Sequence, residues 1–226
     1  MQWWLADAWN FNPAVAVSWV FWVVVSIVLH ELGHGVAAIR CGDPTPRASG
    51  HMTLNPMVHI PPMAWLMFAL FGFTWGLMPV QPSNFHGRYD DSKVALAGPS
   101  VNLALALLCA PLAAFWIHLT QMPATGTQPI LEVDGPLRDN VRIFFTVGVM
   151  INLFGLVFNL IPIPPLDGSR IAANFSREYE NFFNSERGAL VGFLAFAGLF
   201  FFGGSAVWGV AMDISANLVA AILRLF

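Results

Sequence analysis

The chain has 226 residues, of which 57% are hydrophobic and only 10% are charged. A soluble domain of this size would be hard to keep in water with that balance, so we expect a protein of the lipid bilayer. The formal net charge of −3, without a long basic run, excludes nucleic acid as an expected partner.

The amino-terminal third predicts one spanning helix followed by a shorter apolar piece. Residues 14–39 are apolar and lie between Pro13 and a Gly- and Pro-rich stretch that stops a helix. The residues before them lack the basic flank of a secretory signal peptide, so we expect this helix to stay in the mature protein. Residues 62–77 are apolar but only about 16 long, which leaves both a short span and a re-entrant piece open.

The remainder predicts further long helices. The second covers about 94–118, and the third covers about 141–161 and ends at three prolines that cannot continue it. Residues 174–187 are polar with aromatic residues at helical spacing, which indicates an amphipathic helix, either in the membrane interface or packed on its neighbours. Residues 188–222 are too long for one comfortable span and predict one broken helix or two short ones.

The first long helix contains His30, Glu31 and His34 in the pattern H-E-x-x-H. Residues four apart share a helical face, so both imidazoles can reach one zinc ion, and Glu31 can take a proton from metal-bound water. Ionisable groups deep in a membrane are costly and usually functional. The alternative is a pair of histidines that are satisfied by hydrogen bonds within the bundle.

A catalytic zinc ion takes three protein ligands and keeps a fourth position for water, so a third ligand must come from elsewhere. Asp167 follows a proline-rich stretch whose extended backbone makes a rigid mount, and we favour it. Asp213, Glu178 and Glu180 are weaker candidates. A glutamate ligand would suit a prenyl-processing type of membrane protease.

The position of Asp167 sets a condition on topology. The first and third long helices must run in the same direction, which holds if residues 62–77 do not cross the membrane. The positive-inside rule supports this arrangement, because seven basic residues then fall on one side and two on the other. It predicts the amino terminus outside and the metal site toward the cytoplasm, with Arg224 depending on how the tail crosses. The seven are Arg40, Arg47, Arg88, Lys93, Arg170, Arg177 and Arg187, and the two are Arg138 and Arg142.

The expected fold class is therefore an all-α polytopic membrane protein. It has about four to five transmembrane helices, with a re-entrant or hairpin segment between the first two long ones. We see no internal repeat and expect a single integral-membrane domain over 1–226, with its core at 14–168. The expected location is the cell membrane, and the sequence carries no signal for an oligomeric state.

Three motifs in order resemble those of the site-2 protease family of intramembrane zinc metalloproteases, in its compact bacterial type without a PDZ or CBS domain. They are His30 to His34, a G-P-x-x-N element at 98–102, and an N-x-x-P-x-x-x-x-D-G element at 159–168. The resemblance implies one zinc ion per chain on His30, His34 and Asp167, with Glu31 as the general base. It also implies that Asn159 orients the substrate or stabilises the oxyanion.

The predicted function is hydrolysis of a peptide bond within or near the transmembrane segment of a membrane protein substrate, whose helix must unwind locally. The alternative is a zinc-binding membrane protein without protease activity, such as a chaperone or transporter; the intact Glu31 argues against it. Two loop histidines, His51 and His59, are expected to be interfacial rather than ligands. Asn102 is open between a role in the site and helix packing. The family's compact members carry an acid where this chain has Pro61, so we assign that loop no role.

Overall fold

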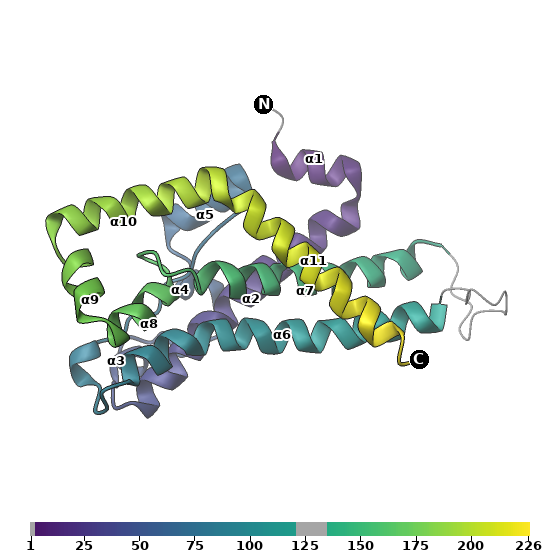
Figure 1. Ribbon diagram of the computed structural model, residues 1–226. Coiled ribbons are helices and arrows are strands. Elements are labelled where there is room, and N and C mark those ends of the chain that lie inside the picture. The colour runs from purple at the N-terminus through teal and green to yellow at the C-terminus, as the bar shows by residue number, and fades with distance from the viewer. Residues whose placement is uncertain (1–2, 121–134) are drawn as a thin grey trace.

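The computed structural model describes residues 3–120 and 135–226, and every regular element among them is a helix (Figure 1). Among these described residues, four helical segments are long and apolar enough to cross a membrane. The all-α polytopic fold is therefore confirmed, and the chain is a multi-pass membrane protein. The four are α2 (Pro13–Arg40), α6 (Asp90–Thr120), α7 (Pro136–Asn159) and the bent helix formed by α10 and α11 (Glu186–Leu223).

Helices α2, α6 and α7 form the core of the bundle and pack pairwise on one another. Their close approach depends on small residues of α6, because five alanines on that helix are fully buried. The five are Ala95, Ala106, Ala110, Ala113 and Ala114. Trp22 of α2 donates its indole N–H to the carbonyl oxygen of Phe144 in α7 at 2.8 Å, which fixes the relative height of those two helices.

The ends of α6 and α7 differ from the predicted ones for local reasons. Helix α6 begins at Asp90, about one turn before the predicted start, and Asp90 and Asp91 in its first turn interact favourably with the positive end of the helix dipole. Helix α7 begins at Pro136, a residue suited to the first helical position. It ends at Asn159, before the prolines, as they require.

The segment between α2 and α6 turns back instead of crossing. Helix α5 (Pro62–Phe71) has 10 residues and is about 15 Å long, half of the hydrocarbon thickness. It ends at Gly72, whose φ of 80° is a left-handed cap that favours glycine. Residues 73–81 then return without helical structure. The short helices nearby are α3 (Thr45–Ala48), α4 (Pro56–His59) and the 3₁₀ turn η1 (Pro82–Asn84).

Asp43 holds together the loops at this end of the bundle. Its buried carboxylate accepts the N–H groups of Thr45 at 3.0 Å and Gln81 at 2.7 Å, the side-chain amide of Asn84 at 2.9 Å and the Thr45 hydroxyl. Burial alone would raise the pKa of Asp43, but these hydrogen bonds to the charged form outweigh it and hold the pKa at about 2. The carboxylate therefore ties residue 43 to residues 81–84 at neutral pH.

The polar stretch at 174–187 is divided among three helices rather than forming one. It spans the end of α8 (Asp167–Phe175), all of α9 (Arg177–Phe183) and the start of α10 (Glu186–Gly198). The breaks occur at Ser176 and Ser185, whose hydroxyls accept the N–H groups of Tyr179 at 3.2 Å and Gly188 at 3.1 Å. Serine caps of this kind begin a new helix.

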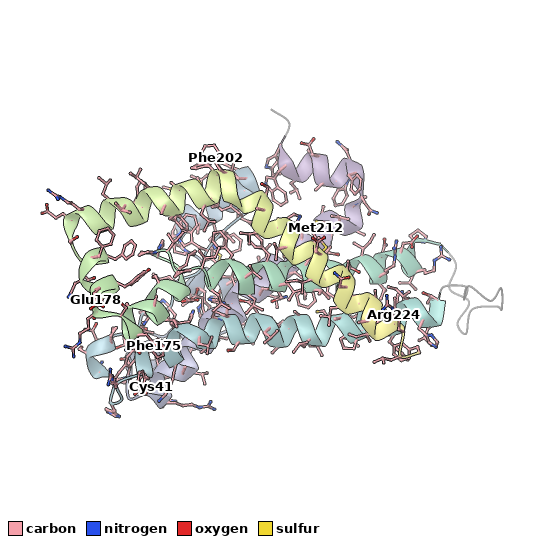
Figure 2. All side chains as sticks on the ribbon, in the orientation of Figure 1. Cys41, Phe175, Glu178, Phe202, Met212 and Arg224 are labelled. Atoms are coloured by element: carbon pink, nitrogen blue, oxygen red, sulfur yellow. The ribbon has the colours of Figure 1, made fainter. Side chains whose placement is uncertain are left out.

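The last apolar stretch is one continuous but bent helix. A π-helical turn, η2 (Leu199–Gly203), joins α10 to α11 (Gly204–Leu223), and α11 packs on α6 and α7. The ring of Phe226 lies 4.9 Å from that of His118 in α6. Figure 2 accordingly shows Arg224 at the end of the molecule opposite to Cys41 and Glu178.

Candidate metal centre

Two histidines of α2 and the first residue of α8 meet inside the bundle. The Nε2 atoms of His30 and His34 are 3.0 Å apart, and Oδ2 of Asp167 lies 3.2 Å from the first and 3.3 Å from the second. The side chains of His30 and His34 are 10% and 7% exposed and that of Asp167 is 12% exposed, so all three are largely buried. Within the described residues, they are the one group of three or more His, Cys, Asp or Glu side chains arranged to hold a metal ion. The topological condition set by the sequence is met.

The hydrogen bonds of the outer ring nitrogens define which atoms face the centre. Nδ1 of His34 lies 2.7 Å from the carbonyl oxygen of Val94, which can only accept, so Nδ1 holds the proton. Nδ1 of His30 lies 2.6 Å from Oδ1 of Asn102, whose amide nitrogen donates to Oδ1 of Asn152 at 3.0 Å. In the neutral imidazoles both Nε2 atoms therefore present lone pairs.

Three acceptors thus point at one another: two imidazole nitrogens and a carboxylate oxygen. Oδ2 of Asp167 is buried and has no hydrogen-bond partner. A single proton can bridge only two acceptors, whereas one divalent cation satisfies all three. Two nitrogens and one oxygen are the ligand types of catalytic zinc sites, in which a fourth position stays open. The residues present therefore fit a zinc ion.

Gly98 of α6 leaves the space that the centre needs. A Cβ atom at this position would lie 2.5 Å from Nε2 of His30 and 2.5 Å from Nε2 of His34. Because such a contact is far shorter than van der Waals distance, any side chain here would displace the imidazoles. The glycine of the G-P-x-x-N element is thus explained by a close approach of backbone to the site.

A series of hydrogen-bonded asparagines lies behind His30, and the sequence predicted only part of it. Asn102, which the sequence left open between site and packing, does both: it accepts from His30 and donates to Asn152. Asn152 is fully buried and donates in turn to the carbonyl oxygen of Gly148. Sequence reasoning missed Asn152, although an asparagine inside an apolar helix, two turns before Asn159, was a usable signal.

Glu31 lies on the side of the centre that faces the returning segment. Its side chain is buried and packs against Gly76, where an added Cβ would overlap the carboxylate. The N–H of the next residue, Leu77, donates to the carbonyl oxygen of His59 at 2.8 Å. Residues 73–80 therefore form a non-helical wall beside the carboxylate.

The other predicted candidates are not part of this group of three side chains. The amide of Asn159 donates to Gly155 within its own helix at 3.0 Å, and Asp213, Glu178 and Glu180 are exposed on α11 and α9. Figure 2 shows Glu178 at the outer edge of the molecule. His59 is buried with Nε2 2.7 Å from the Thr53 carbonyl oxygen, and His51 lies next to Ser49. His59 is the last residue of α4 and is fully buried, and neither it nor His51 belongs to the group of three acceptors.

Comparison with known proteins adds independent information. The family model described as peptidase family M50 matches residues 18–202. Three similar relatives are named, provisionally, as zinc metalloproteases. YwhC of Bacillus subtilis (strain 168) is 35% identical over 67% of this chain and 66% of its own length. Rip2 of Mycolicibacterium smegmatis is 34% identical over 64% of this chain and 52% of its own length. MJ0611 of Methanocaldococcus jannaschii is 27% identical over 72% of each.

The chain thus spans less than two thirds of the first two relatives that it matches. No solved structure matches the chain. The family match includes both histidines of α2 and Asp167.

Proposed function

The chain belongs to peptidase family M50, and from this premise we propose that it is an intramembrane zinc metalloendopeptidase. It hydrolyses a peptide bond within or near the transmembrane segment of a membrane protein substrate. The observation that carries the proposal is the convergence of three acceptor atoms, from His30, His34 and Asp167, on one point beside Glu31. A site with those ligand types and an adjacent free carboxylate suits hydrolysis.

Each residue has a distinct part in this proposal. His30, His34 and Asp167 would hold a zinc ion through Nε2, Nε2 and Oδ2, and Asn102 keeps His30 in the tautomer that presents Nε2. Glu31 is the general base. Asn159 is proposed to stabilise the oxyanion, for which its amide must turn away from Gly155, the partner it has in this structure.

The reaction follows from these positions. When bound, zinc polarises the scissile carbonyl group and lowers the pKa of a bound water molecule toward 7. Glu31 removes a proton from the attacking water and then delivers it to the leaving nitrogen. The surrounding helices exclude bulk water from Glu31, which is 8% exposed, so that its charge acts in a medium of low polarity.

The proposed location is the cell membrane, with the centre toward the cytoplasm. Arg224 lies at the end of the bundle opposite to Cys41 (Figure 2), where α6 ends and α7 begins with Arg138 and Arg142, so basic residues divide seven against three between the two ends. The end that holds the loops near the metal centre has seven of them. The positive-inside rule assigns that end to the cytoplasm.

The test is cleavage of co-expressed single-span membrane proteins. The wild-type protein is expected to bind one zinc ion and to cleave a substrate, and Glu31→Gln is expected to retain zinc and cleave nothing. Glu178→Gln is the matched control, because that carboxylate is exposed on α9; it should retain both zinc and activity. Asp167→Asn should lose zinc. A wild-type protein that binds zinc but never cleaves in a Glu31-dependent way would instead be a zinc-binding membrane protein without protease activity.

A further inference from the structure

Three tryptophans near the amino terminus donate to the carboxyl end of α5. Trp4, at the start of α1 (Trp4–Phe11), donates its indole N–H to the carbonyl oxygens of Phe68 at 3.0 Å and Ala69 at 3.1 Å. Trp3 donates to Ala69 as well. Trp19, in α2, donates to the carbonyl oxygen of Gly72 at 2.9 Å. The amino-terminal segment and the re-entrant helix are thus joined by specific hydrogen bonds.

The last four carbonyl groups of a helix lack a partner within it, and the indole bonds of Trp3 and Trp4 supply one for the carbonyl oxygen of Ala69. The carbonyl oxygen of Phe68 also accepts the N–H of Gly72 at 2.9 Å, so the Trp4 bond adds a second donor there. The ring of Trp4 also lies over Gly72, where a Cβ atom would be 2.8 Å from its Cδ2. The point at which α5 turns back is therefore fixed by both polar and steric contacts with Trp4 and Trp19.

Gly72, where the chain turns back, lies four residues before Gly76, which contacts Glu31. From Gly72 the chain runs without helical structure to Gly76, which packs against the Glu31 carboxylate, and the next N–H is held by His59 at 2.8 Å. Along the chain, the segment is thus anchored before Gly76 by the bond to Gly72 and after Gly76 by the bond from Leu77. Loss of either anchor would free the backbone that confines the carboxylate.

We propose that Trp19 and Trp4 are positioning residues for the reaction, which act through the 72–77 segment to hold Glu31 in place. This inference rests on the proposed function for its catalytic consequence. The indole bond of Trp19 at one end of the segment and the His59 carbonyl at the other set where Gly76 meets the carboxylate. A general base displaced by about 1 Å loses up to about a hundredfold in rate.

The experiment compares Trp19→Phe with Trp116→Phe in the full-length protein. Both variants lose one indole-to-carbonyl bond of 2.9 Å, but that of Trp116 joins α6 to Arg138, away from the site. Phenylalanine keeps an aromatic ring and removes the donor. For the substrate cleaved in the preceding test, Trp19→Phe should lower kcat ten- to hundredfold. KM and bound zinc should stay within twofold, and Trp116→Phe should match the wild type in all three.

A second readout does not depend on proteolysis. The N–H of Leu77 is the hydrogen-bonded amide at the far anchor, and its hydrogen exchange should be faster in Trp19→Phe than in the wild type or Trp116→Phe. Unchanged exchange at Leu77, or an unchanged kcat, overturns the inference. So does a fall in zinc content parallel to that in kcat, since this indicates a structural role alone. Faster exchange in a protein whose wild type shows no Glu31-dependent cleavage would refute the proposed function and leave the anchoring in place.

Discussion

Replacing Asn102 with leucine is expected to weaken zinc binding without unfolding the bundle. The substitution removes the acceptor 2.6 Å from Nδ1 of His30 and leaves that N–H unpaired in a site where His30 is 8% exposed. An unsatisfied buried donor costs about 1–3 kcal/mol. The imidazole can avoid this cost by moving its proton to Nε2, but it then loses the lone pair that binds the metal. Since about 1.4 kcal/mol is tenfold in affinity, we expect zinc to bind roughly 10- to 100-fold more weakly.

The measurement is competition for zinc between the detergent-solubilised protein and a chelator of known affinity. Two variants of the same helix are the controls. Asn102→Asp keeps an acceptor for His30 and should bind zinc more tightly than the leucine variant. Ser100→Ala loses only a bond from an exposed hydroxyl to the Leu96 carbonyl oxygen of its own helix and should match the wild type. If Asn102→Leu holds zinc as tightly as the wild type, the tautomer of His30 is not set by this asparagine and the reasoning is wrong.

Three further predictions concern the surroundings of the centre. Gly98→Ala should abolish zinc binding while the protein stays folded, because the added methyl group occupies the space between the two imidazoles; retained zinc would contradict this. Gly76→Ala should keep zinc and lower kcat by roughly a hundredfold, since the methyl group displaces Glu31; a normal kcat would contradict it. The protein should lose stability in acid through Asp43, whose pKa in the folded state is about 2, below the usual 3.8. The charged carboxylate therefore adds about 2 kcal/mol to the free energy of unfolding above pH 4, and this contribution should be lost as the pH falls toward 2. Thermal unfolding of Asp43→Asn in detergent should lack this pH dependence, and an equal acid sensitivity in both proteins would exclude Asp43 as its source.

The long helices and the group of three acceptors were within reach of sequence reasoning because each rests on a strong local signal. Hydropathy over 18 or more residues marks the spans, and the four-residue spacing of His30 and His34 places both on one helical face. Asp167 was favoured because prolines make its mount rigid, and the resemblance to the site-2 protease family implied it as the third ligand; the direction of the helices was a condition that this choice had to meet. Hydropathy and helical spacing can be read from a few neighbouring residues, and the direction of each helix follows from the number of membrane crossings.

The features that escaped prediction depend on contacts between distant segments. The indole bonds of Trp4 and Trp19 join residues more than 50 positions apart, and nothing in the local sequence indicates which carbonyl groups they reach. The bond from Asn102 to Asn152 joins two helices at a height that only their packing defines. The full burial of His59 likewise depends on a distant contact, because α4 packs against α2.

Non-helical backbone borders the candidate metal centre on two sides, next to Asp167 and next to Glu31. Such backbone at membrane depth must be buried in protein or face water, and both stretches are held by specific bonds. Residues 160–166, which precede Asp167, are fixed by the Tyr179 hydroxyl, which donates to the carbonyl oxygen of Pro162 at 3.0 Å, and by the N–H of Leu166, which donates to Ile163 at 2.9 Å. The 72–77 segment is fixed by indole N–H groups and His59. One stretch carries Asp167 and the other packs against Glu31, so the two groups that the proposed reaction requires at the substrate are held by anchored loops as well as by helix packing.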